Sequence, residues 1–165
     1  MTSDASANSP VAGKVLIVDD LRANVDLLDQ LLTREGYRVE TASTGEEALA
    51  AANRFRPDVI LLDVMMPGLD GFEVCRRLKG DLATRLTPVV LVTALRERED
   101  KIQGLNAGAD DYLTKPVNAH ELRARVRSLV RLKRFTDELD FADSVLLTLA
   151  MTIEARDPYT DGHCH

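Results

Sequence analysis

The sequence predicts an α/β protein with a doubly wound, parallel, five-stranded sheet, and three observations lead to this fold class. Short apolar segments rich in β-branched residues, among them 15–18, 59–62 and 89–92, are typical of strands covered on both faces. Segments with apolar residues at helical spacing alternate with these strands. The chain has 165 residues, which is enough for one such domain with a sizeable core and an additional segment.

Five segments are expected to form the strands because of their apolar or β-branched composition. In chain order they are residues 15–18, 37–41, 59–62, 89–92 and 112–114. Pro88 stands at the entry of the fourth strand, where a residue without a backbone N–H does little harm. Because a helix separates each strand from the next, the sheet should be parallel with right-handed crossovers.

The intervening helices are recognised by their apolar spacing and by the residues at their ends. They are expected over about residues 21–36, 44–52, 70–80 and 97–106, with a fifth beginning at residue 119. Thr44 and Glu47 have the spacing of a capping box, and Asp70 can cap the third helix. Gly36 and Gly108 suit the ends of the first and fourth helices.

The last helix is expected to be much longer than the others. Leu122, Val126 and Leu129 form its buried stripe, and apolar residues then continue in steps of three and four that resemble a coiled-coil seam. These later residues are Phe135, Leu139, Ala142, Leu146, Leu149 and Ile153. Because this stretch contains no proline or glycine, we expect one long helix, or two in line, as a C-terminal helical extension.

Composition excludes several classes of protein. A net charge of −6 argues against nucleic acid as a partner, because binding to phosphates requires a basic surface. Cys75 and Cys164 lie far apart without metal-ligand spacing, so a reducing cytoplasm fits best. Residues 1–12 are expected to form a disordered leader, since they lack the features of a signal peptide. No run approaches the ~20 apolar residues of a membrane span.

Polar side chains at the carboxyl ends of the strands define the candidate site. Asp19 and Asp20 follow the first strand, Asp63 the third, Thr93 ends the fourth, and Lys115 follows the fifth. Ligands of open α/β sheets bind at this edge. Three carboxylates in one crevice repel one another, and burial penalises their charged forms further, so we expect a divalent cation there. The all-oxygen ligand set suits Mg²⁺ or Mn²⁺ rather than zinc.

These residues suggest phosphoryl chemistry. With a metal beside it, Asp63 can attack a phosphoryl group and become an acyl phosphate. Lys115 would stabilise charge on the phosphoryl oxygens, and the Thr93 hydroxyl could donate a hydrogen bond to one of them. An isolated acid after a strand more often caps a turn, but acids at the neighbouring strand end favour the reactive role for Asp63.

Four motifs, in this order, resemble the receiver domain of bacterial response regulators. They are Val-Leu-Ile-Val-Asp-Asp at 15–20, Leu-Leu-Asp-Val-Met-Met-Pro at 61–67, Val-Thr-Ala at 92–94 and Asp-Tyr-Leu-Thr-Lys-Pro at 111–116. The resemblance covers residues 13–134 and implies the flavodoxin-like strand order 2-1-3-4-5. It also implies phosphoryl transfer to Asp63 from a sensor histidine kinase or a phosphotransfer protein.

The same resemblance implies a role for each site residue. Mg²⁺ would be held by Asp20, Asp63 and the backbone carbonyl of Met65, with Asp19 assisting, partly through water.

Thr93 and Tyr112 match the switch pair of the family, in which the hydroxyl moves toward the phosphate and the ring turns inward. The Lys115–Pro116 peptide bond is expected to be cis.

The last helix carries basic residues that either form a solvated face or pair with acids of a second chain. The bases are Arg123, Arg125, Arg127, Arg131, Lys133 and Arg134, and the acids are Glu97, Glu99 and Asp100. Since receiver dimers resemble the second arrangement, we expect a homodimer through the fourth and fifth helices and the C-terminal helix.

Residues 152–163 resemble the opening of HD-GYP phosphodiesterase domains, which hydrolyse cyclic di-GMP at a metal centre. His163 matches the first metal-binding histidine of that family, but one histidine cannot build the centre. We therefore expect residues 135–165 to be a helical linker and the truncated start of an output domain, and this chain to be a switch rather than an enzyme. The alternative is a dimerisation helix with a frayed end.

Two further alternatives share parts of this pattern. An aspartyl-nucleophile phosphatase would favour a second acid two residues after Asp63, where this chain has Met65. A flavodoxin-type FMN binder would have a phosphate-binding loop after the first strand, where this chain has Asp19 and Asp20.

Overall fold

The computed structural model describes residues 12–94 and 98–156, and the chain divides into two units, Met1–Lys133 and Arg134–His165. The strands are β1 (Lys14–Val18), β2 (Arg38–Ala42), β3 (Val59–Asp63), β4 (Val89–Thr93) and β5 (Asp111–Thr114). The helices are α1 (Arg22–Arg34), α2 (Gly45–Phe55), α3 (Gly71–Gly80), α4 (Arg98–Asn106) and α5 (Ala119–Ala155). All ten expected elements are therefore present, and α5 is one helix rather than two.

The strands of the first unit form one parallel sheet in the order β2-β1-β3-β4-β5, which confirms the predicted topology. Val18 pairs with Ala42 on β2 and with Leu62 on β3, while Thr93 pairs with Thr114 on β5. Because all strands run in one direction, their carboxyl ends meet at a single edge of the sheet.

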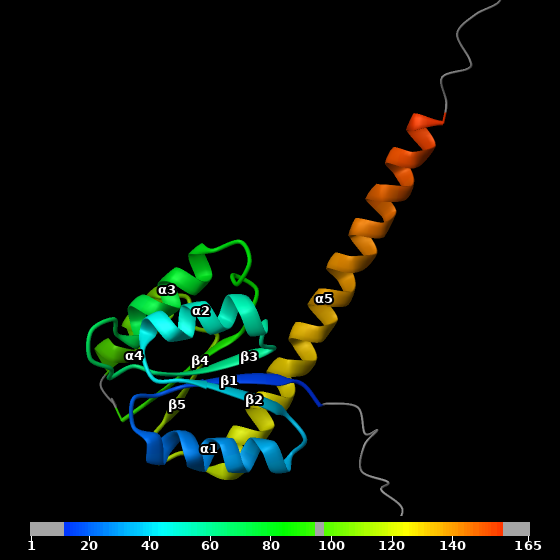
Figure 1. Ribbon diagram of the computed structural model, residues 1–165. Helices are drawn as coiled ribbons and strands as arrows, with labels where there is room; N and C mark the ends of the chain where they lie inside the picture. Colours follow the sequence, from blue (N-terminus) through cyan, green and yellow to red (C-terminus); the bar gives the residue numbers. More distant parts are fainter. Residues whose placement is uncertain (1–11, 95–97, 157–165) are drawn as a thin grey trace, which may run out of the picture. The chain divides into compact units, whose positions relative to one another are not determined.

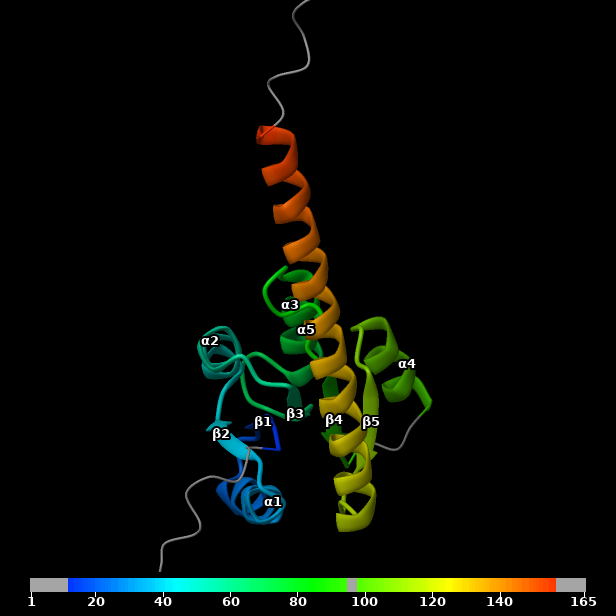
Figure 2. The ribbon, with the colours of Figure 1, turned by 90° about the vertical axis from the view of Figure 1, so that its right-hand side faces the viewer.

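Alternation along the strands divides the core into two layers. Residues such as Leu16 and Leu62 pack with α2, α3 and α4, whereas Ile17 and Leu61 pack with α1 and the beginning of α5. Figures 1 and 2 show these helices on opposite faces of the sheet. Since both faces are covered, the central strands β3 and β4 are buried throughout, as their continuous apolar sequences predicted.

The helix ends explain where the chain changes direction. Asp70 accepts a hydrogen bond from the Glu73 N–H at 2.9 Å, as expected for the cap of α3. Thr44 likewise accepts from the Glu47 N–H at 3.2 Å, but the Glu47 carboxylate bonds to the Ser43 N–H and hydroxyl. In a standard capping box the Glu47 carboxylate would accept from the N–H of Thr44, whereas here it accepts from the N–H of the preceding residue, Ser43.

Helix α5 begins with a cap that its sequence spacing did not reveal. The side-chain oxygen Oδ1 of Asn118 accepts hydrogen bonds from the N–H groups of His120 and Glu121, at 2.9 and 3.1 Å. Leu122 and Val126 are buried as predicted, Leu129 is half-buried, and Val130 completes the buried stripe. In the second unit, the side chains of α5 from residue 137 to residue 155 are exposed.

Several predictions fall on residues outside the described ranges. These are most of the leader, residue Glu97 at the beginning of the fourth helix, and the C-terminal residues from 157 onward with His163 and Cys164. Within residues 12–94 and 98–156, no helix combines the length and the apolar character needed to cross a bilayer.

Candidate functional site

The carboxyl edge of the sheet brings together the residues that the motifs singled out. Asp19 follows β1 directly, Asp63 is the last residue of β3, Thr93 ends β4, and Lys115 follows β5. The backbone N–H of Lys115 donates to the Thr93 carbonyl at 2.8 Å, which extends the β4–β5 ladder to this lysine. Four separate strands thus place their terminal side chains around one position.

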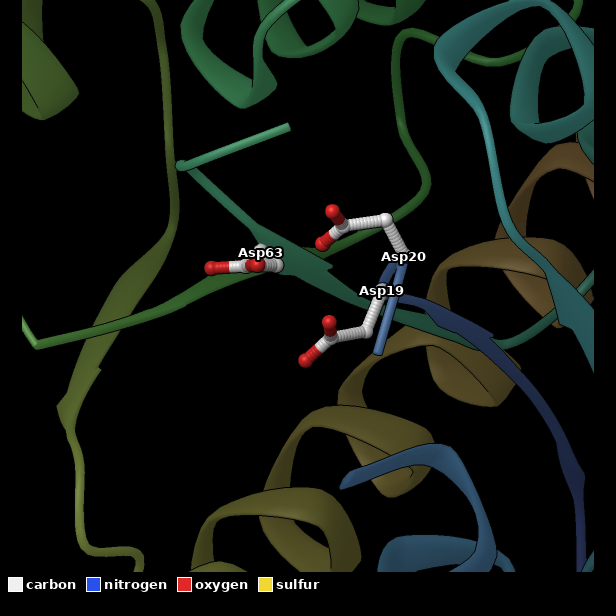
Figure 3. Close-up of side chains that lie close together, drawn as sticks. All are labelled: Asp19, Asp20 and Asp63. Atoms are coloured by element: carbon white, nitrogen blue, oxygen red, sulfur yellow. The ribbon is translucent and has the colours of Figure 1, made fainter. Parts of the chain in front are cut away.

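The three carboxylates form a close cluster, which Figure 3 shows with Asp19 and Asp20 at the end of β1 and Asp63 at the end of β3. One carboxylate oxygen from each of them lies within 4.8 Å of those of the other two. Asp19 and Asp63 are 3% and 4% exposed, whereas Asp20 is exposed. The cluster therefore has a buried floor of two acids and a third acid at the solvent side.

Both oxygens of Asp19 are held by donors. Its Oδ1 accepts from the Leu21 N–H at 2.9 Å, and its Oδ2 accepts from the side-chain amide of Asn24 and from the Lys115 ammonium, each at 3.1 Å. Asn24 lies in the first turn of α1. Two of these donors lie at the beginning of α1 and the third follows β5. Because they fix the carboxylate from both sides, its orientation is set before any ligand binds.

Asp63 is less well compensated. Its Oδ1 lies 3.5 Å from the Lys115 ammonium and 3.4 Å from the Met65 N–H. Burial raises the pKa of Asp63, and the nearby charge of Asp19 raises this pKa further, while Lys115 and the Met65 N–H oppose the change. One ammonium group thus serves two buried carboxylates, which leaves surplus negative charge at the edge of the sheet.

Gly71, at the beginning of α3, allows the backbone there to lie very close to the end of β3. A Cβ atom on Gly71 would lie 2.3 Å from the Asp63 carbonyl oxygen and 2.7 Å from the Val64 Cα. The Gly71 N–H donates to the Val64 carbonyl at 3.0 Å, which closes the loop. A side chain at position 71 would therefore displace the backbone that carries Asp63. The side chain of Met65 is exposed.

Thr93 and Tyr112 are already in contact. The Thr93 side chain is fully buried, and a hydrogen bond links it to the Tyr112 side chain. Burial raises the pKa of Tyr112, as does the charge of Asp100, while the bond to Thr93 opposes them. The ring of Tyr112 borders a pocket of about 250 Å³ between α4 and β5, which is also lined by Gly104 and Leu105.

The Lys115–Pro116 bond is cis, as predicted.

The basic residues of α5 are partly used within their own chain: Arg125 pairs with Asp111 of β5 at 2.5 Å, and Arg123 pairs with Glu35 at 3.5 Å. Within the first unit, these two arginines therefore hold the beginning of α5 against Glu35 at the end of α1 and Asp111 of β5.

The donor set fits a hard divalent cation. All three side chains offer oxygen ligands, two of them are buried, and among the described residues the Lys115 ammonium relieves their mutual repulsion. Mg²⁺ favours such sites, with a small number of carboxylates and a solvent-exposed side that retains water. An exposed acid such as Asp20 next to two buried ones provides that side.

Comparison with known protein families gives a match to the response regulator receiver domain over residues 15–127. The chain belongs to this family. Its receiver is 59% identical over 129 residues to the response regulator PleD of Caulobacter vibrioides, covering 78% of this chain and 28% of that protein. It is 49% identical over 118 residues to the alkaline phosphatase synthesis regulator PhoP of Bacillus subtilis, covering 72% of this chain and 48% of PhoP.

Solved receivers have the same fold. A response regulator from Chloroflexus aurantiacus matches with a TM-score of 0.69 and 38% identity, over 72% of this chain and 98% of that structure. The receiver domain of the sensor histidine kinase PA1611 from Pseudomonas aeruginosa matches with a TM-score of 0.67 and 32% identity, over 72% and 97%. That structure has a magnesium ion coordinated in its active site cleft. The chain spans well under two thirds of the lengths of PleD and PhoP.

The motifs located the charged residues of this receiver but not the residues that position them. Asn24 was missed because a polar residue in an exposed first helical turn is common and carries no pattern of its own. Gly71 was missed because close backbone approach is a property of the folded loop. A polar residue in the first turn of a helix that begins three residues after a strand-terminal acid is the one signal that could have pointed to Asn24.

Proposed function

We propose that this receiver accepts a phosphoryl group on Asp63 and that the state of Asp63 controls an attached output. The observation that carries the proposal is the sharing of the Lys115 ammonium between two buried carboxylates, Asp19 and Asp63, at 3.1 and 3.5 Å. A site built for stability alone would give each buried acid its own donor. Surplus negative charge at an open edge is suited to a bound cation and a transferred phosphoryl group.

In the proposed step, a carboxylate oxygen of Asp63 attacks the phosphorus of a phosphohistidine on the donor protein. The new O–P bond gives an acyl phosphate, the N–P bond breaks, and the imidazole leaves with its electron pair and takes up a proton. Lys115 is placed to neutralise the phosphoryl oxygens, which it reaches by releasing part of its contact with Asp63. Asp19 keeps its orientation through the Leu21 N–H and Asn24.

We propose that Asp20, Asp63 and the Met65 carbonyl hold Mg²⁺, or Mn²⁺, with Asp19 assisting. When bound, the cation supplies charge neutralisation for the carboxylates and the incoming phosphoryl group. The exposed position of Asp20 supports its role, since a ligand at the solvent side can bind the cation without the burial of another charge.

The proposed signal is a change in the Thr93–Tyr112 pair. In this structure the Thr93 hydroxyl is engaged with Tyr112. A phosphoryl oxygen on Asp63 offers a charged acceptor, and charge-assisted hydrogen bonds are about twice as strong as neutral ones. Transfer of Thr93 to the phosphate would free the Tyr112 ring to turn inward, next to α4 and β5.

The phosphorylation proposal is tested with a small acyl-phosphate donor and Mg²⁺, followed by intact-mass measurement. We expect the wild-type chain to gain one phosphoryl group and Asp63→Asn to gain none. Asp70→Asn is the matched control, because it makes the same chemical change after the same strand while asparagine still caps α3. Undiminished labelling of Asp63→Asn would refute the site assignment.

We propose a sensor histidine kinase or a phosphotransfer protein as the donor, in the cytoplasm, and a second copy of the chain as a further partner. Exposed Glu99 and the half-buried Asp100 on α4, with exposed bases such as Arg127 and Arg131 on α5, support pairing between copies. Because Arg123 and Arg125 are engaged within their own chain, this contact depends on bases such as Arg127 and Arg131. We do not propose nucleic acid or membrane as partners.

We further propose that the output is an HD-GYP-like phosphodiesterase domain, with His163 as one of its metal ligands. The support is the resemblance of residues 152–163 to the opening of that family. This chain would then relay a signal without turnover of its own, since residue 65, where an aspartyl phosphatase favours an acid, is an exposed methionine. Sequencing the gene beyond the codon of His165 tests the proposal: absence of further histidine and aspartate ligands would reject it.

A further inference from the structure

Helix α4 meets the sheet without large apolar side chains, in contrast to the other helices. Among the described residues, neither layer of the core includes a member of α4, and Ile102 and Leu105 are 49% and 72% exposed. The residues of α4 that face inward are the half-buried Asp100 and the buried Gly104. They are four positions apart and therefore lie on one side of the helix. The inner face of α4 thus presents an acid and a glycine to the sheet.

Gly104 lies against the ring of Tyr112. A Cβ atom at position 104 would be 3.6 Å from the Cδ2 and Cε2 atoms of Tyr112 and 3.0 Å from the Cδ1 atom of Leu91. Leu91 and Tyr112 are paired residues of β4 and β5, so the glycine covers this pair. Figure 2 shows α4 next to β5. Glycine destabilises a helix interior relative to alanine, and room for the Tyr112 ring accounts for its presence here.

Asp100 brings a negative charge near the Tyr112 hydroxyl. Burial raises the pKa of Tyr112, and the charge of Asp100 raises it further, whereas the hydrogen bond from Thr93 lowers it. A carboxylate nearby favours the neutral phenol and attracts the hydrogen end of its O–H dipole. The lone pairs of the phenol oxygen are then left to accept the hydrogen bond from Thr93. Asp100 and Gly104 therefore favour the same arrangement, in which the ring lies against α4 and Thr93 is engaged.

We propose that Asp100 and Gly104, together called the Tyr112 seat, hold the Tyr112 ring in its present position and thereby set how readily Thr93 is released. Both act on Thr93 through Tyr112, so they are positioning residues. The inference rests on the proposed phosphorylation of Asp63. It deepens that proposal by naming the residues of α4 that oppose the switch in the unphosphorylated chain.

The chain offers a matched control for each residue of the Tyr112 seat. Gly104→Ala adds a methyl group against the ring, whereas Gly80→Ala adds one at the end of α3, where a Cβ atom would have nothing within 4 Å. Asp100→Asn removes a charge next to Tyr112. Asp26→Asn makes the same change at an exposed acid that lines a pocket with Asp20 on the opposite side of the site. These controls account for helix propensity and for the general attraction of an anionic donor.

The rate of phosphorylation by a small acyl-phosphate donor with Mg²⁺, followed by intact mass, measures the release of Thr93. This rate follows the fraction of molecules in which the Thr93 hydroxyl is free. Gly104→Ala should lower the rate about fourfold, the effect of burying about one methyl group against the seated ring. Asp100→Asn should raise it about threefold, the effect of one partly exposed charge. Gly80→Ala should match the wild-type chain, and Asp26→Asn should change the rate less than Asp100→Asn does.

A second background separates the Tyr112 seat from a merely structural role of its residues. Tyr112→Phe keeps the ring but lacks the hydroxyl that binds Thr93, so neither Gly104→Ala nor Asp100→Asn should alter the rate in that background. Persistence of either effect there would overturn the proposal. Equal rates for Asp100→Asn and Asp26→Asn, or a rate for Gly104→Ala that is not below that of Gly80→Ala, would overturn it as well.

Failure of the seat and failure of the phosphorylation site give different results. Labelling of the wild-type chain with equal rates in all variants rejects the Tyr112 seat alone, and absence of labelling rejects the phosphorylation site. In the second case urea unfolding still tests the seat. The effects of Asp100→Asn and Tyr112→Phe on the free energy of unfolding should then be coupled, and additive effects would reject the seat.

Discussion

The two edges of the sheet use the same residue types in opposite ways. At the amino edge, the Asp58 carboxylate accepts a hydrogen bond from the Lys14 N–H at 2.8 Å. The Asp110 carboxylate accepts hydrogen bonds from the Lys79 ammonium at 2.6 Å and from the Val89 N–H at 2.8 Å. At the carboxyl edge, one ammonium group is divided between Asp19 and Asp63 at longer distances. The amino edge matches its acids with donors, whereas at the carboxyl edge Asp19 is matched and Asp63 has only long contacts with its donors.

The difference shows what separates a stabilising acid from a reactive one in this fold. Hydrogen-bonded carboxylates such as Asp58 hold adjacent segments together, because loss of a buried partner is costly. Incompletely compensated carboxylates such as Asp63 destabilise the free protein but remain available to a ligand. Active sites often trade stability for function in this way.

Mg²⁺ should have the largest effect, because it supplies the charge that only the carboxyl edge lacks. At a concentration 100-fold above its dissociation constant, we expect Mg²⁺ to raise the free energy of unfolding by about 2.7 kcal/mol. Urea unfolding with and without the metal measures this change. A triple variant with Asn at positions 19, 20 and 63 should show no response, and a full response in that variant would place the cation elsewhere.

The same substitution at the two ends of β3 should shift stability in opposite directions. Asp58→Asn should lower the free energy of unfolding by about 1 kcal/mol, since a charge-assisted hydrogen bond to the Lys14 N–H becomes a neutral one. Asp63→Asn should raise it, since burial and the nearby charge of Asp19 disfavour the charged form of Asp63 and raise its pKa. Both variants are compared by urea unfolding in metal-free buffer. A change of the same sign in both would contradict the comparison of the edges.

Asn24 should matter for the site rather than for the fold. Asn24→Ala removes the amide that orients Asp19, and we expect about a tenfold loss of Mg²⁺ affinity. Asn53→Ala is the control, because the Asn53 amide bonds to the Leu49 carbonyl of its own helix. Metal titration followed by calorimetry distinguishes the two, and equal affinities would remove Asn24 from the site.

The pH dependence of stability should differ between the wild-type chain and Asp63→Asn. The folded-state pKa of Asp63 lies above its ordinary value of 3.8. Below pH 3.8 the group is protonated in both the folded and the unfolded chain and does not reduce the free energy of unfolding. As the pH rises through the folded-state pKa, the buried carboxyl group must ionise, and the free energy of unfolding falls. In metal-free buffer, the advantage of Asp63→Asn in the free energy of unfolding should therefore grow as the pH rises through the folded-state pKa of Asp63. An advantage that shrinks instead would reverse the assigned shift.

The sequence was sufficient for the parts of the receiver that depend on local pattern. Strands covered on both faces read as continuous apolar runs, and each reactive side chain stands directly after such a run. This is why Asp19, Asp63, Thr93 and Lys115 could be placed at one edge before any coordinates. The order of the strands came from family resemblance, because apolar composition does not distinguish neighbours in a sheet.

What could not be predicted depends on tertiary geometry or on choices between equivalent partners. Glu47 could return its bond to either of two adjacent N–H groups, and the structure selects Ser43. Asn118 and Asn24 are polar residues at helix beginnings, where such residues are common, yet one caps α5 and the other orients Asp19. Only the folded chain shows which of these roles each residue has.

The contact between Lys115 and Asp19 joins residues 96 positions apart in the chain. During synthesis, the segments that carry Asp19 and Asp63 leave the ribosome well before Lys115 does, and N-terminal segments can begin to fold first. A nascent chain that ends before residue 115 would thus carry Asp63, the proposed acceptor, without its lysine. The charge pairing of the proposed site is therefore complete only after synthesis has passed β5 and Lys115.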